Sequence, residues 1–180
     1  MKHSRFRQGL FFCLACLLCL CAAAAAEDAG LGVFTLRSTE MPGEAGAVPV
    51  PMQCGPTEQF LSAGTEIDLS APYVFFGQAD CWAMVAPGSA GGYGAVGWVP
   101  SAAAAFPDGP ELLFEDAVPV TVMEDTFLTL EPLAETPAQL CTVKEGAQPV
   151  VLAVCGGWAY VQTETGGAPV RAFLPLSSFL

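Results

Sequence analysis

A short stretch occurs twice in this chain, and this duplication constrains the fold more than any other feature. Residues 81–85 read Cys-Trp-Ala-Met-Val and lead to Gly-Trp-Val-Pro at 97–100. Residues 157–161 read Gly-Trp-Ala-Tyr-Val and lead to Ala-Phe-Leu-Pro at 172–175. The step from the first tryptophan to the second motif is 15 residues in one copy and 14 in the other. Such a repeat indicates one small fold used twice, which favours a binding protein over an enzyme.

The start of the chain has the three-part layout of a secretory signal. Three basic residues precede an apolar run at 10–20, which is followed by alanines at 22–26. The run is shorter than the roughly 20 residues that span a bilayer, and no second such run follows. We therefore expect a signal peptide at 1–26 and a secreted, extracellular or cell-wall-associated mature chain without a transmembrane segment.

Four cysteines in or beside the apolar run leave a lipid anchor as an alternative. Bacterial lipoprotein signals place a small residue before the cysteine and an aliphatic residue three positions before it. Cys16 follows Ala15 but has Cys13 at the aliphatic position, and Cys21 follows Leu20. Removal with the signal peptide is the favoured expectation for these four residues, Cys13, Cys16, Cys19 and Cys21.

The expected mature chain is strongly acidic. The whole sequence has 18 Asp and Glu against 6 Lys and Arg, and three of the basic residues lie in the predicted signal peptide. Its remaining cations are Arg37, Lys144 and Arg171. Because such a surface repels phosphate backbones and anionic lipids, we expect no nucleic-acid partner. The acidity is expected to maintain solubility, and attraction of cationic ligands is the alternative.

The only histidine, His3, lies in the predicted signal peptide. Without it the mature chain cannot assemble a Cys-His or Ser-His-Asp nucleophile, and it lacks the usual imidazole ligands of zinc. The carboxylate pairs Glu115-Asp116 and Glu124-Asp125 are adjacent residues, which point to opposite faces of a strand or into water from a turn. We therefore expect no enzymatic activity, no cofactor and no metal, with a carboxylate-based hydrolase as the weakest alternative.

After the signal peptide the chain reads as short strands broken by glycine, proline and acidic turns, which predicts an all-β protein. A predicted strand pair at 32–38 and 47–52 has a counterpart at 117–123 and 127–130. Between the two copies, residues 101–111 hold four alanines and two prolines and mark a domain boundary. The expected organisation is a signal peptide at 1–26, a first domain at 31–106, a linker at 107–116 and a second domain at 117–180.

Two cysteines fall in each half, Cys54 and Cys81 in the first and Cys141 and Cys155 in the second. Domains of this size bury only roughly 60% of their unfolded surface and are marginally stable. One disulfide in each half could contribute about 3 kcal/mol. Four cysteines allow three pairings, and the sequence does not choose among them. A four-thiolate metal site is a weaker alternative, because no Cys-x-x-Cys spacing occurs.

Motifs in the second half carry a resemblance to a known family. Residues 128–136, Leu-Thr-Leu-Glu-Pro-Leu-Ala-Glu-Thr, stand in the place of the stretch LNVRSGPST of bacterial SH3 (SH3b) domains. Residues 142–146 resemble TLKKG, residues 156–161 resemble GGWYKV, and residues 171–175 stand for the ending GWVP. The order of the motifs and their duplication identify both halves as similar to SH3b domains.

The first half keeps the Gly-Pro-Thr of the family at 55–57 and the Gly-Trp-Val-Pro ending at 97–100. Both halves depart from the family by lacking its Asn-x-Arg. The second half has also lost Gly-Pro at 133–134 and the glycine at Ala172. The resemblance covers nearly the whole mature chain and implies two small SH3-like β-barrels in tandem, without an attached catalytic domain.

Alternation along the strands indicates which side chains could bind a ligand. Ala83 and Val85 suit a tight barrel interior, so Trp82 points to the opposite face, and Trp158 does the same in the second copy. The resemblance implies that this opposite face is the ligand groove; packing within the barrel is the alternative role, which we expect for Trp98. The implied ligand-binding residues are Gly55, Pro56, Thr57, Trp82, Pro100, Glu131, Glu135, Trp158, Tyr160 and Pro175.

The sequence therefore favours a non-catalytic extracellular binding module. The resemblance implies recognition of cell-wall peptide, peptidoglycan or another extracellular ligand through SH3b grooves. Two linked sites would strengthen binding by roughly 10²-fold or more when both are engaged. The alternative is a scaffold that binds a separately encoded secreted protein such as a wall hydrolase.

Overall fold

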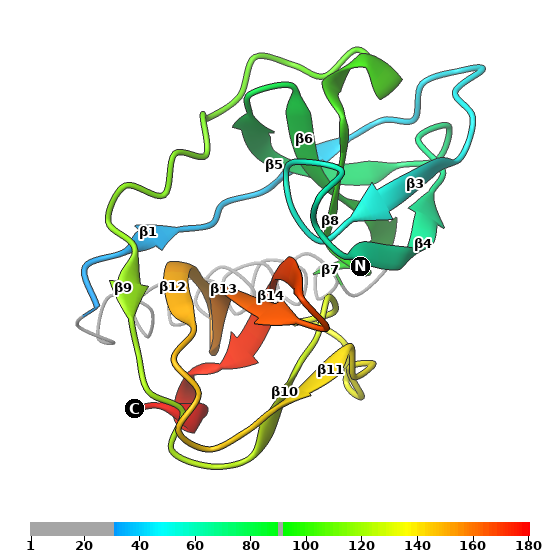
Figure 1. The fold of residues 1–180 in the computed structure, drawn as a ribbon. Helices are drawn as coiled ribbons and strands as arrows, with labels where there is room; N and C mark the ends of the chain where they lie inside the picture. Colours follow the sequence, from blue (N-terminus) through cyan, green and yellow to red (C-terminus); the bar gives the residue numbers. More distant parts are fainter. Residues whose placement is uncertain (1–30, 90–91) are drawn as a thin grey trace, which may run out of the picture.

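The computed structural model describes residues 31–89 and 92–180, so the predicted signal peptide at 1–26 lies outside the described residues. Strands and two short 3-10 turns make up the regular structure of these residues, which confirms the all-β prediction (Figure 1). The strands form sheets of seven, five and two strands, and no closed barrel is found among the described residues. The SH3-like architecture therefore stays a prediction. None of the described helical turns approaches the length of a membrane-crossing helix.

Strands β2 to β8, the first half, form the seven-stranded sheet in the order β2-β5-β6-β8-β3-β4, with β7 paired to β6. A 3-10 turn, η1 (Ser101–Ala103), follows the last of these strands. Their bounds are β2 (Thr39–Met41), β3 (Val50–Gln53), β4 (Ser62–Ile67), β5 (Tyr73–Ala79), β6 (Trp82–Ser89), β7 (Gly92–Tyr93) and β8 (Gly97–Pro100).

Strands β9 to β14, the second half, form a sheet in the order β12-β13-β14, with β9 and β1 also paired to β12, and a separate pair β10-β11. A second 3-10 turn, η2 (Leu176–Ser178), follows the last strand. The bounds are β1 (Phe34–Thr35), β9 (Val118–Pro119), β10 (Thr126–Leu128), β11 (Cys141–Val143), β12 (Val150–Cys155), β13 (Trp158–Thr165) and β14 (Ala168–Pro175).

The duplication seen in the sequence is also present in the strand register. Trp82 lies opposite Pro100 in the first half, and Trp158 lies opposite Pro175 in the second. The hairpins β5-β6 and β12-β13 also carry a register shift at equivalent places. Further equivalent pairs are Ala83 with Val99 and Ala159 with Leu174, then Met84 with Trp98 and Tyr160 with Phe173.

Each half is preceded by a short segment that pairs with the other half. Strand β1, which the sequence places in the first domain, runs parallel to β12, and the Leu36 N–H donates to the Val154 carbonyl at 2.9 Å (Figure 1). In the predicted linker, Glu111 forms a parallel bridge with Gln78 of β5. The Gln78 carbonyl accepts a hydrogen bond from the Leu112 N–H at 2.7 Å. We call β1 and residues 110–112 the lead-in segments. Each of them pairs with the half that it does not precede, so the lead-in segments are exchanged between the halves.

Gly77 allows the second of these segments to approach β5. Its φ of +145° belongs to the region that favours glycine, and a Cβ at this position would lie 2.4 Å from the Pro110 carbonyl oxygen. The Gln78 N–H donates to the same oxygen at 3.0 Å. Residues 110–112 of the predicted linker are thus held against the first half by backbone contacts.

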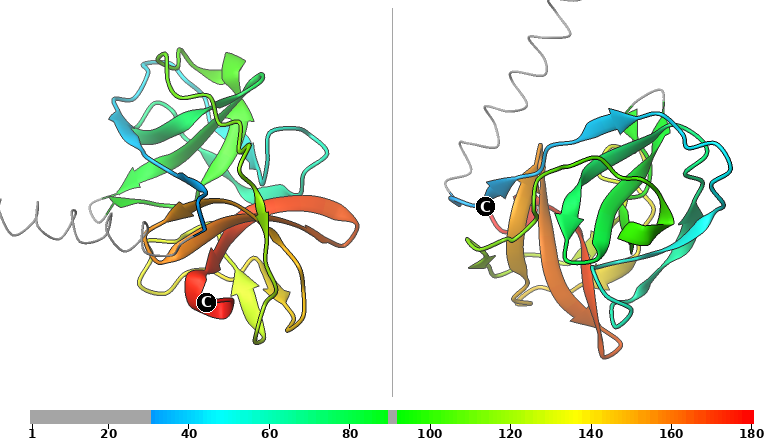
Figure 2. Two further views of the ribbon diagram at one scale, coloured as in Figure 1. Left: turned by 90° about the vertical axis from the view of Figure 1, so that its left-hand side faces the viewer. Right: turned by 90° about the horizontal axis from the view of Figure 1, so that it is seen from above.

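The two faces of each central hairpin are buried in different cores. Ala83 and Val85 lie wholly buried in the core of the first half, and Ala159 and Val161 lie wholly buried in that of the second, as the alternation predicts. The opposite faces pack against each other across the molecule, so that the halves lie face to face (Figure 2). This shared core contains Leu36, Val74, Phe76, Met84, Ala86, Val96, Trp98, Leu112, Leu152, Ala153, Tyr160 and Phe173.

Two backbone hydrogen bonds between the halves are also reciprocal. The Cys54 carbonyl accepts from the Arg171 N–H at 2.8 Å, and the Leu130 carbonyl accepts from the Val96 N–H at 2.7 Å. Cys54 and Leu130 occupy equivalent positions, each following the residue that bridges to β8 or β14. The contact between the halves thus has approximate twofold symmetry, like the isologous interface of a homodimer.

Candidate functional site

Tyr160 lies at the centre of the shared core. It is 2% exposed, and its Oη accepts a hydrogen bond from Trp98 Nε1 at 2.7 Å, while Trp98 itself is wholly buried. Burial is the main cause that raises the pKa of the Tyr160 phenol, which therefore stays neutral. The face on which the sequence places a ligand groove is, at this residue, an internal contact between the halves.

The two tryptophans of the repeat lie at the rim of the shared core and are partly exposed. Trp158 meets the Phe127 ring edge-on, with centroids 6.5 Å apart, and lies opposite Pro175. We call these three residues the Trp158 ledge. Trp82 lies opposite the exposed Pro100. Both tryptophans thus keep surface that a ligand can reach.

The predicted loop residues are divided between surface and interior. Gly55 and Pro56 are buried, whereas Thr57 is exposed and its Oγ1 accepts from the Gln59 N–H at 3.3 Å. A Cβ at Gly55 would lie 2.1 Å from the Phe60 ring, so this glycine makes room for an aromatic side chain. These residues support the turn, and they line neither of the two pockets described below.

A small pocket lies between the halves, and Glu131 is the predicted site residue that lines it. The pocket has a volume of about 250 Å³ and is formed by Ala63 and Thr65 of β4 together with Leu130 and Leu140 of the second half. Glu131 Oε2 accepts a hydrogen bond from the Ala138 N–H at 3.2 Å. Glu135 is exposed and does not line this pocket. Of these two acidic residues predicted to bind a ligand, Glu131 therefore lines the pocket and Glu135 does not.

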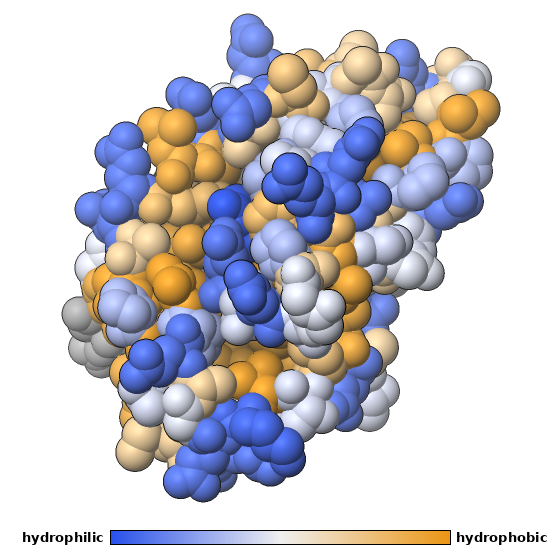
Figure 3. Space-filling model, viewed as in Figure 1, coloured by the Kyte–Doolittle hydropathy of each residue, from blue (hydrophilic) through white to orange (hydrophobic). Residues whose placement is uncertain are grey.

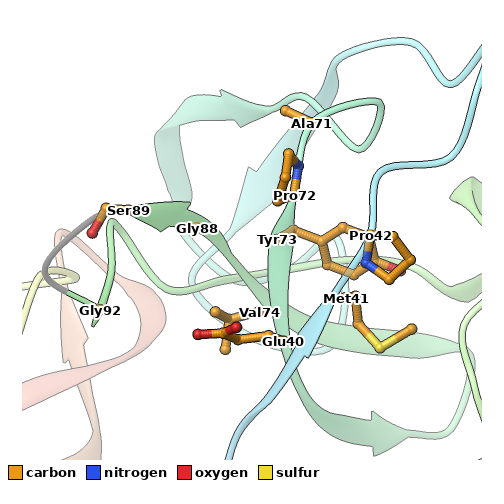
Figure 4. A pocket seen from close by; sticks show the side chains of 10 residues that line it. All are labelled: Glu40, Met41, Pro42, Ala71, Pro72, Tyr73, Val74, Gly88, Ser89 and Gly92. Atoms are coloured by element: carbon orange, nitrogen blue, oxygen red, sulfur yellow. The ribbon is translucent and has the colours of Figure 1, made fainter. Parts of the chain in front are cut away.

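A larger pocket lies at the edge of the seven-stranded sheet, beside β2 and the β6-β7 hairpin (Figure 4). Its volume is about 570 Å³, and Glu40, Tyr73 and Ser89 contribute to its wall. None of the ligand-binding residues expected from the sequence lines it. The sequence analysis does not single out Glu40 or Phe127, because neither belongs to a motif. Phe127 begins the predicted strand at 127–130, and Glu40 lies between the predicted strands at 32–38 and 47–52.

Arg171 connects three parts of the chain. Its Nε donates to Gln162 Oε1 at 2.8 Å, and its guanidinium carbon lies 5.3 Å and 5.4 Å from the ring centroids of Phe60 and Phe114. Burial lowers the pKa of the guanidinium. Within residues 31–89 and 92–180 the ion pair present is that between Lys144 and Asp125, at 2.6 Å. Arg171 therefore holds the predicted linker against β14 through aromatic contacts.

The cysteines of the described chain are free thiols, so the expectation of one disulfide in each half is not borne out. Cys81 is exposed at the β5-β6 turn, whereas Cys54 is wholly buried in the core of the second half. The Cys155 Sγ lies 3.2 Å from Tyr93 Oη, and Cys141 is partly buried on β11. The two cysteines of the first half therefore lie in different environments, one at the surface and one in the core of the second half. This arrangement differs from the predicted disulfide between them.

Alkylation is expected to distinguish the two cysteines of the first half. Desolvation raises the pKa of the Cys54 thiol to about 12, so its thiolate fraction at pH 8 is about a thousandfold below that of an ordinary thiol. With iodoacetamide and no reductant, we expect rapid modification of the exposed Cys81 and modification of Cys54 only in denaturant. Peptide mass spectrometry measures both rates. Equal rates, or a Cys81 that reacts only after reduction, would contradict this arrangement.

Among the residues that the structure describes, no group of three or more His, Cys, Asp or Glu side chains is placed to hold a metal ion. Comparison with protein-family models, curated proteins and solved structures finds no match to this chain. The resemblance of the repeat to SH3b domains therefore stands on the sequence motifs alone. The candidate site consists of the Trp158 ledge, with Trp82 and Pro100 as its counterpart in the first half.

Proposed function

We propose that the protein is a non-catalytic, secreted binding module that recognises cell-wall peptide or peptidoglycan through SH3b-like surfaces. The observation that carries the proposal is the Trp158 ledge, where a partly exposed indole meets an aromatic ring edge-on and lies opposite a proline on the neighbouring strand. Tryptophan supplies a large, rigid contact area for little loss of side-chain entropy. Neighbouring Tyr160 is fully used in packing, whereas Trp158 keeps free surface.

Several features support binding over catalysis. The expected mature chain has no imidazole, which the common nucleophile systems require. The carboxylates Glu115 and Asp116, like Glu124 and Asp125, are exposed and adjacent in the chain, so they do not flank a substrate as paired glycosidase carboxylates do. The strands instead present a duplicated surface, and a weak contact repeated on one chain gains strength through avidity.

Binding to purified peptidoglycan tests the proposal. We expect Trp158→Ala to weaken binding about tenfold, because an aromatic anchor at a binding surface typically contributes more than 1 kcal/mol. Trp82→Ala is expected to have a smaller effect, since no aromatic ring of the described residues meets Trp82 as Phe127 meets Trp158. The double variant is expected to abolish retention. Co-sedimentation with purified sacculi measures the bound fraction.

Two controls separate binding from folding. Met123→Ala removes an exposed apolar side chain outside the ledge, since Met123 is 67% exposed. Trp158→Phe keeps an aromatic ring in the rim of the shared core. Thermal unfolding of each variant must match that of the unmodified chain. The proposal fails if the unmodified protein is not retained, or if folded Trp158→Ala binds as well as Met123→Ala.

One observation favours the scaffold alternative, in which a secreted protein is the partner. Phe34 and Leu113 are 40% and 59% exposed, and the Phe34 ring meets Phe114 edge-on at 6.4 Å. Figure 3 shows apolar residues gathered on the side of the molecule where β1 and the predicted linker run. Exposed apolar surface of this kind fits a protein partner. Co-purification with a secreted wall hydrolase would favour this function over direct wall binding.

A further inference from the structure

Arg171, on β14, carries a charge that no carboxylate balances. Its side chain is partly buried, and within residues 31–89 and 92–180 no carboxylate lies within ion-pair distance of the guanidinium. The rings of Phe60 and Phe114 contact the cationic group instead, with centroids 5.3 Å and 5.4 Å from the guanidinium carbon. Charged groups that leave bulk water are usually paired with a group of opposite charge. The place of that group at Arg171 is therefore open to a ligand.

The other copy of the fold shows that this position does not require an arginine. The backbone N–H of Arg171 donates across the contact between the halves, and Val96 makes the reciprocal bond in the first half. Arg171 lies opposite Gln162, which follows the repeated tryptophan by four residues, as Ala86 does in the first copy. Val96 and Ala86 are buried apolar residues of the shared core. The second copy therefore has a polar pair where the first copy has an apolar one, and packing alone does not explain the change.

Gln162 fixes which part of the guanidinium is left free. Its Oε1 accepts a hydrogen bond from Arg171 Nε at 2.8 Å, whereas Nη1 and Nη2 have no hydrogen-bond partner among the described residues. Within the same part of the chain, Ser101 Oγ is the buried side-chain polar atom that lacks a partner, so the two Nη groups of Arg171 lie at the surface. A ligand can therefore reach both groups while the Nε contact stays in place.

The free groups match one kind of ligand. The two Nη groups of a guanidinium can donate in parallel to the two oxygens of a carboxylate, which gives a short bidentate pair. Phe60 has room to contact the guanidinium because residue 55 is glycine, where a Cβ would lie 2.1 Å from the ring. The chain as a whole is acidic, with 18 Asp and Glu against 6 Lys and Arg, so it repels ligands with several negative charges. A single carboxylate on an otherwise uncharged ligand therefore fits better than a phosphate.

We propose that Arg171 is the centre of a carboxylate-binding site. Its Nη groups hold the two oxygens of the ligand, Gln162 orients the guanidinium, and Phe60 and Phe114 flank it. The carboxylate belongs either to a small organic acid or to the free end of a peptide. The site goes beyond the proposed function, because it lies outside the Trp158 ledge and Arg171 is not among the ligand-binding residues that the SH3b resemblance implies.

The test is a titration of the ¹⁵N-labelled whole chain with acetyl-Ala-Ala, whose terminal carboxylate is its single charge. We expect the largest shift at the Nε–H of Arg171. Acetyl-Ala-Ala-amide, which lacks the charge, is expected to bind about tenfold more weakly, as is usual for loss of a charge-assisted hydrogen bond. Arg171→Met keeps an unbranched stem and should weaken binding of acetyl-Ala-Ala to the same extent. The matched control is Arg37→Met, which removes the same charge from an exposed residue elsewhere.

A second variant keeps the test valid if Arg171→Met is unstable. Arg171→Val combined with Gln162→Ala copies the apolar pair of the first half, and we expect it to fold and to lose binding of acetyl-Ala-Ala. Acetate distinguishes the two sources of the carboxylate. Acetate that binds as tightly as acetyl-Ala-Ala identifies a small organic acid, whereas weaker binding of acetate identifies the end of a peptide, and either result supports the site.

Four results would overturn the proposal. Equal binding of the amide, or an equal loss in Arg37→Met, would show that Arg171 does not select the carboxylate. A folded variant without Arg171 that binds as well as the unmodified chain would do the same. Inorganic phosphate that binds more tightly than acetyl-Ala-Ala would replace the carboxylate as the ligand. Trp158→Ala is expected to leave the titration unchanged, so this proposal and the proposed function fail separately.

Discussion

Tyr160→Phe is expected to lower the free energy of unfolding by about 1–3 kcal/mol, although the substitution removes a single oxygen atom. That oxygen accepts the 2.7 Å hydrogen bond from Trp98 Nε1. Trp98 is wholly buried, so in the variant its N–H would stay in the core without an acceptor. The folded state would then carry the uncompensated free-energy cost of removing this group from water. Guanidinium unfolding followed by tryptophan fluorescence measures the change.

A double-mutant cycle shows whether the loss comes from this bond. Trp98→Phe removes the donor, and in Trp98→Phe/Tyr160→Phe neither partner is left unsatisfied, so the two losses should not add. Tyr93→Phe is the matched control, because its hydroxyl lies 3.2 Å from the weakly polar Cys155 Sγ and should contribute less. Additive losses, or a Tyr160→Phe variant as stable as Tyr93→Phe, would contradict a hydrogen bond between the halves.

The sequence predicts one face of each hairpin correctly and leaves the other face open. Ala83 and Ala159 are small, apolar and spaced by strand alternation from their neighbours, so their burial follows from local pattern. Met84 and Tyr160 lie on the opposite faces, and the same pattern fits solvent, a ligand or a second copy of the fold. Only the three-dimensional arrangement shows that the second copy covers them. A tyrosine is particularly ambiguous, since one polar atom suits either a surface or a paired interior position.

The exchange of lead-in segments had no sequence signal. Phe34–Thr35 is a strand of two residues, too short for a period to be read, and a parallel partner can lie far along the chain. The prolines and glycine near 107–110 correctly predict an interruption of regular structure. They do not reveal that Leu112 is buried in the shared core. Composition thus predicts a break between the copies, whereas backbone pairing decides where the connecting chain lies.

The candidate site is predicted only in part for a similar reason. Trp158 was found because it belongs to the repeated motif, and its partner Phe127 was missed because contact between β10 and β13 depends on how the sheets meet. Glu131 and Glu135 are close in sequence, yet of the two only Glu131 lines the pocket between the halves, whose other wall comes from the first half. Contacts made between the copies cannot be read from either copy alone.

Neither half is expected to fold by itself, which is the largest effect that the structure implies. A fragment of residues 31–106 would expose its side of the shared core and would lose the strand partner that residues 110–112 provide to β5. A fragment of residues 107–180 would lose β1 in the same way. Each small domain is marginal even when its own core is intact. We therefore expect each fragment to lack cooperative unfolding, as measured by circular dichroism during a thermal scan.

Mixing the two fragments is expected to restore the fold, because the contacts between the halves are non-covalent. Buried Trp98 then returns to an apolar environment, and its fluorescence should shift to shorter wavelength with a 1:1 stoichiometry. The matched control is the whole chain cleaved at a protease site inserted between residues 106 and 109, which should remain assembled in sedimentation. A fragment that unfolds cooperatively as a monomer would contradict this expectation. Because the interface has approximate twofold symmetry, each half supplies the strand partner and core contacts that the other half lacks. A single half without these contacts is therefore not expected to fold as a monomer.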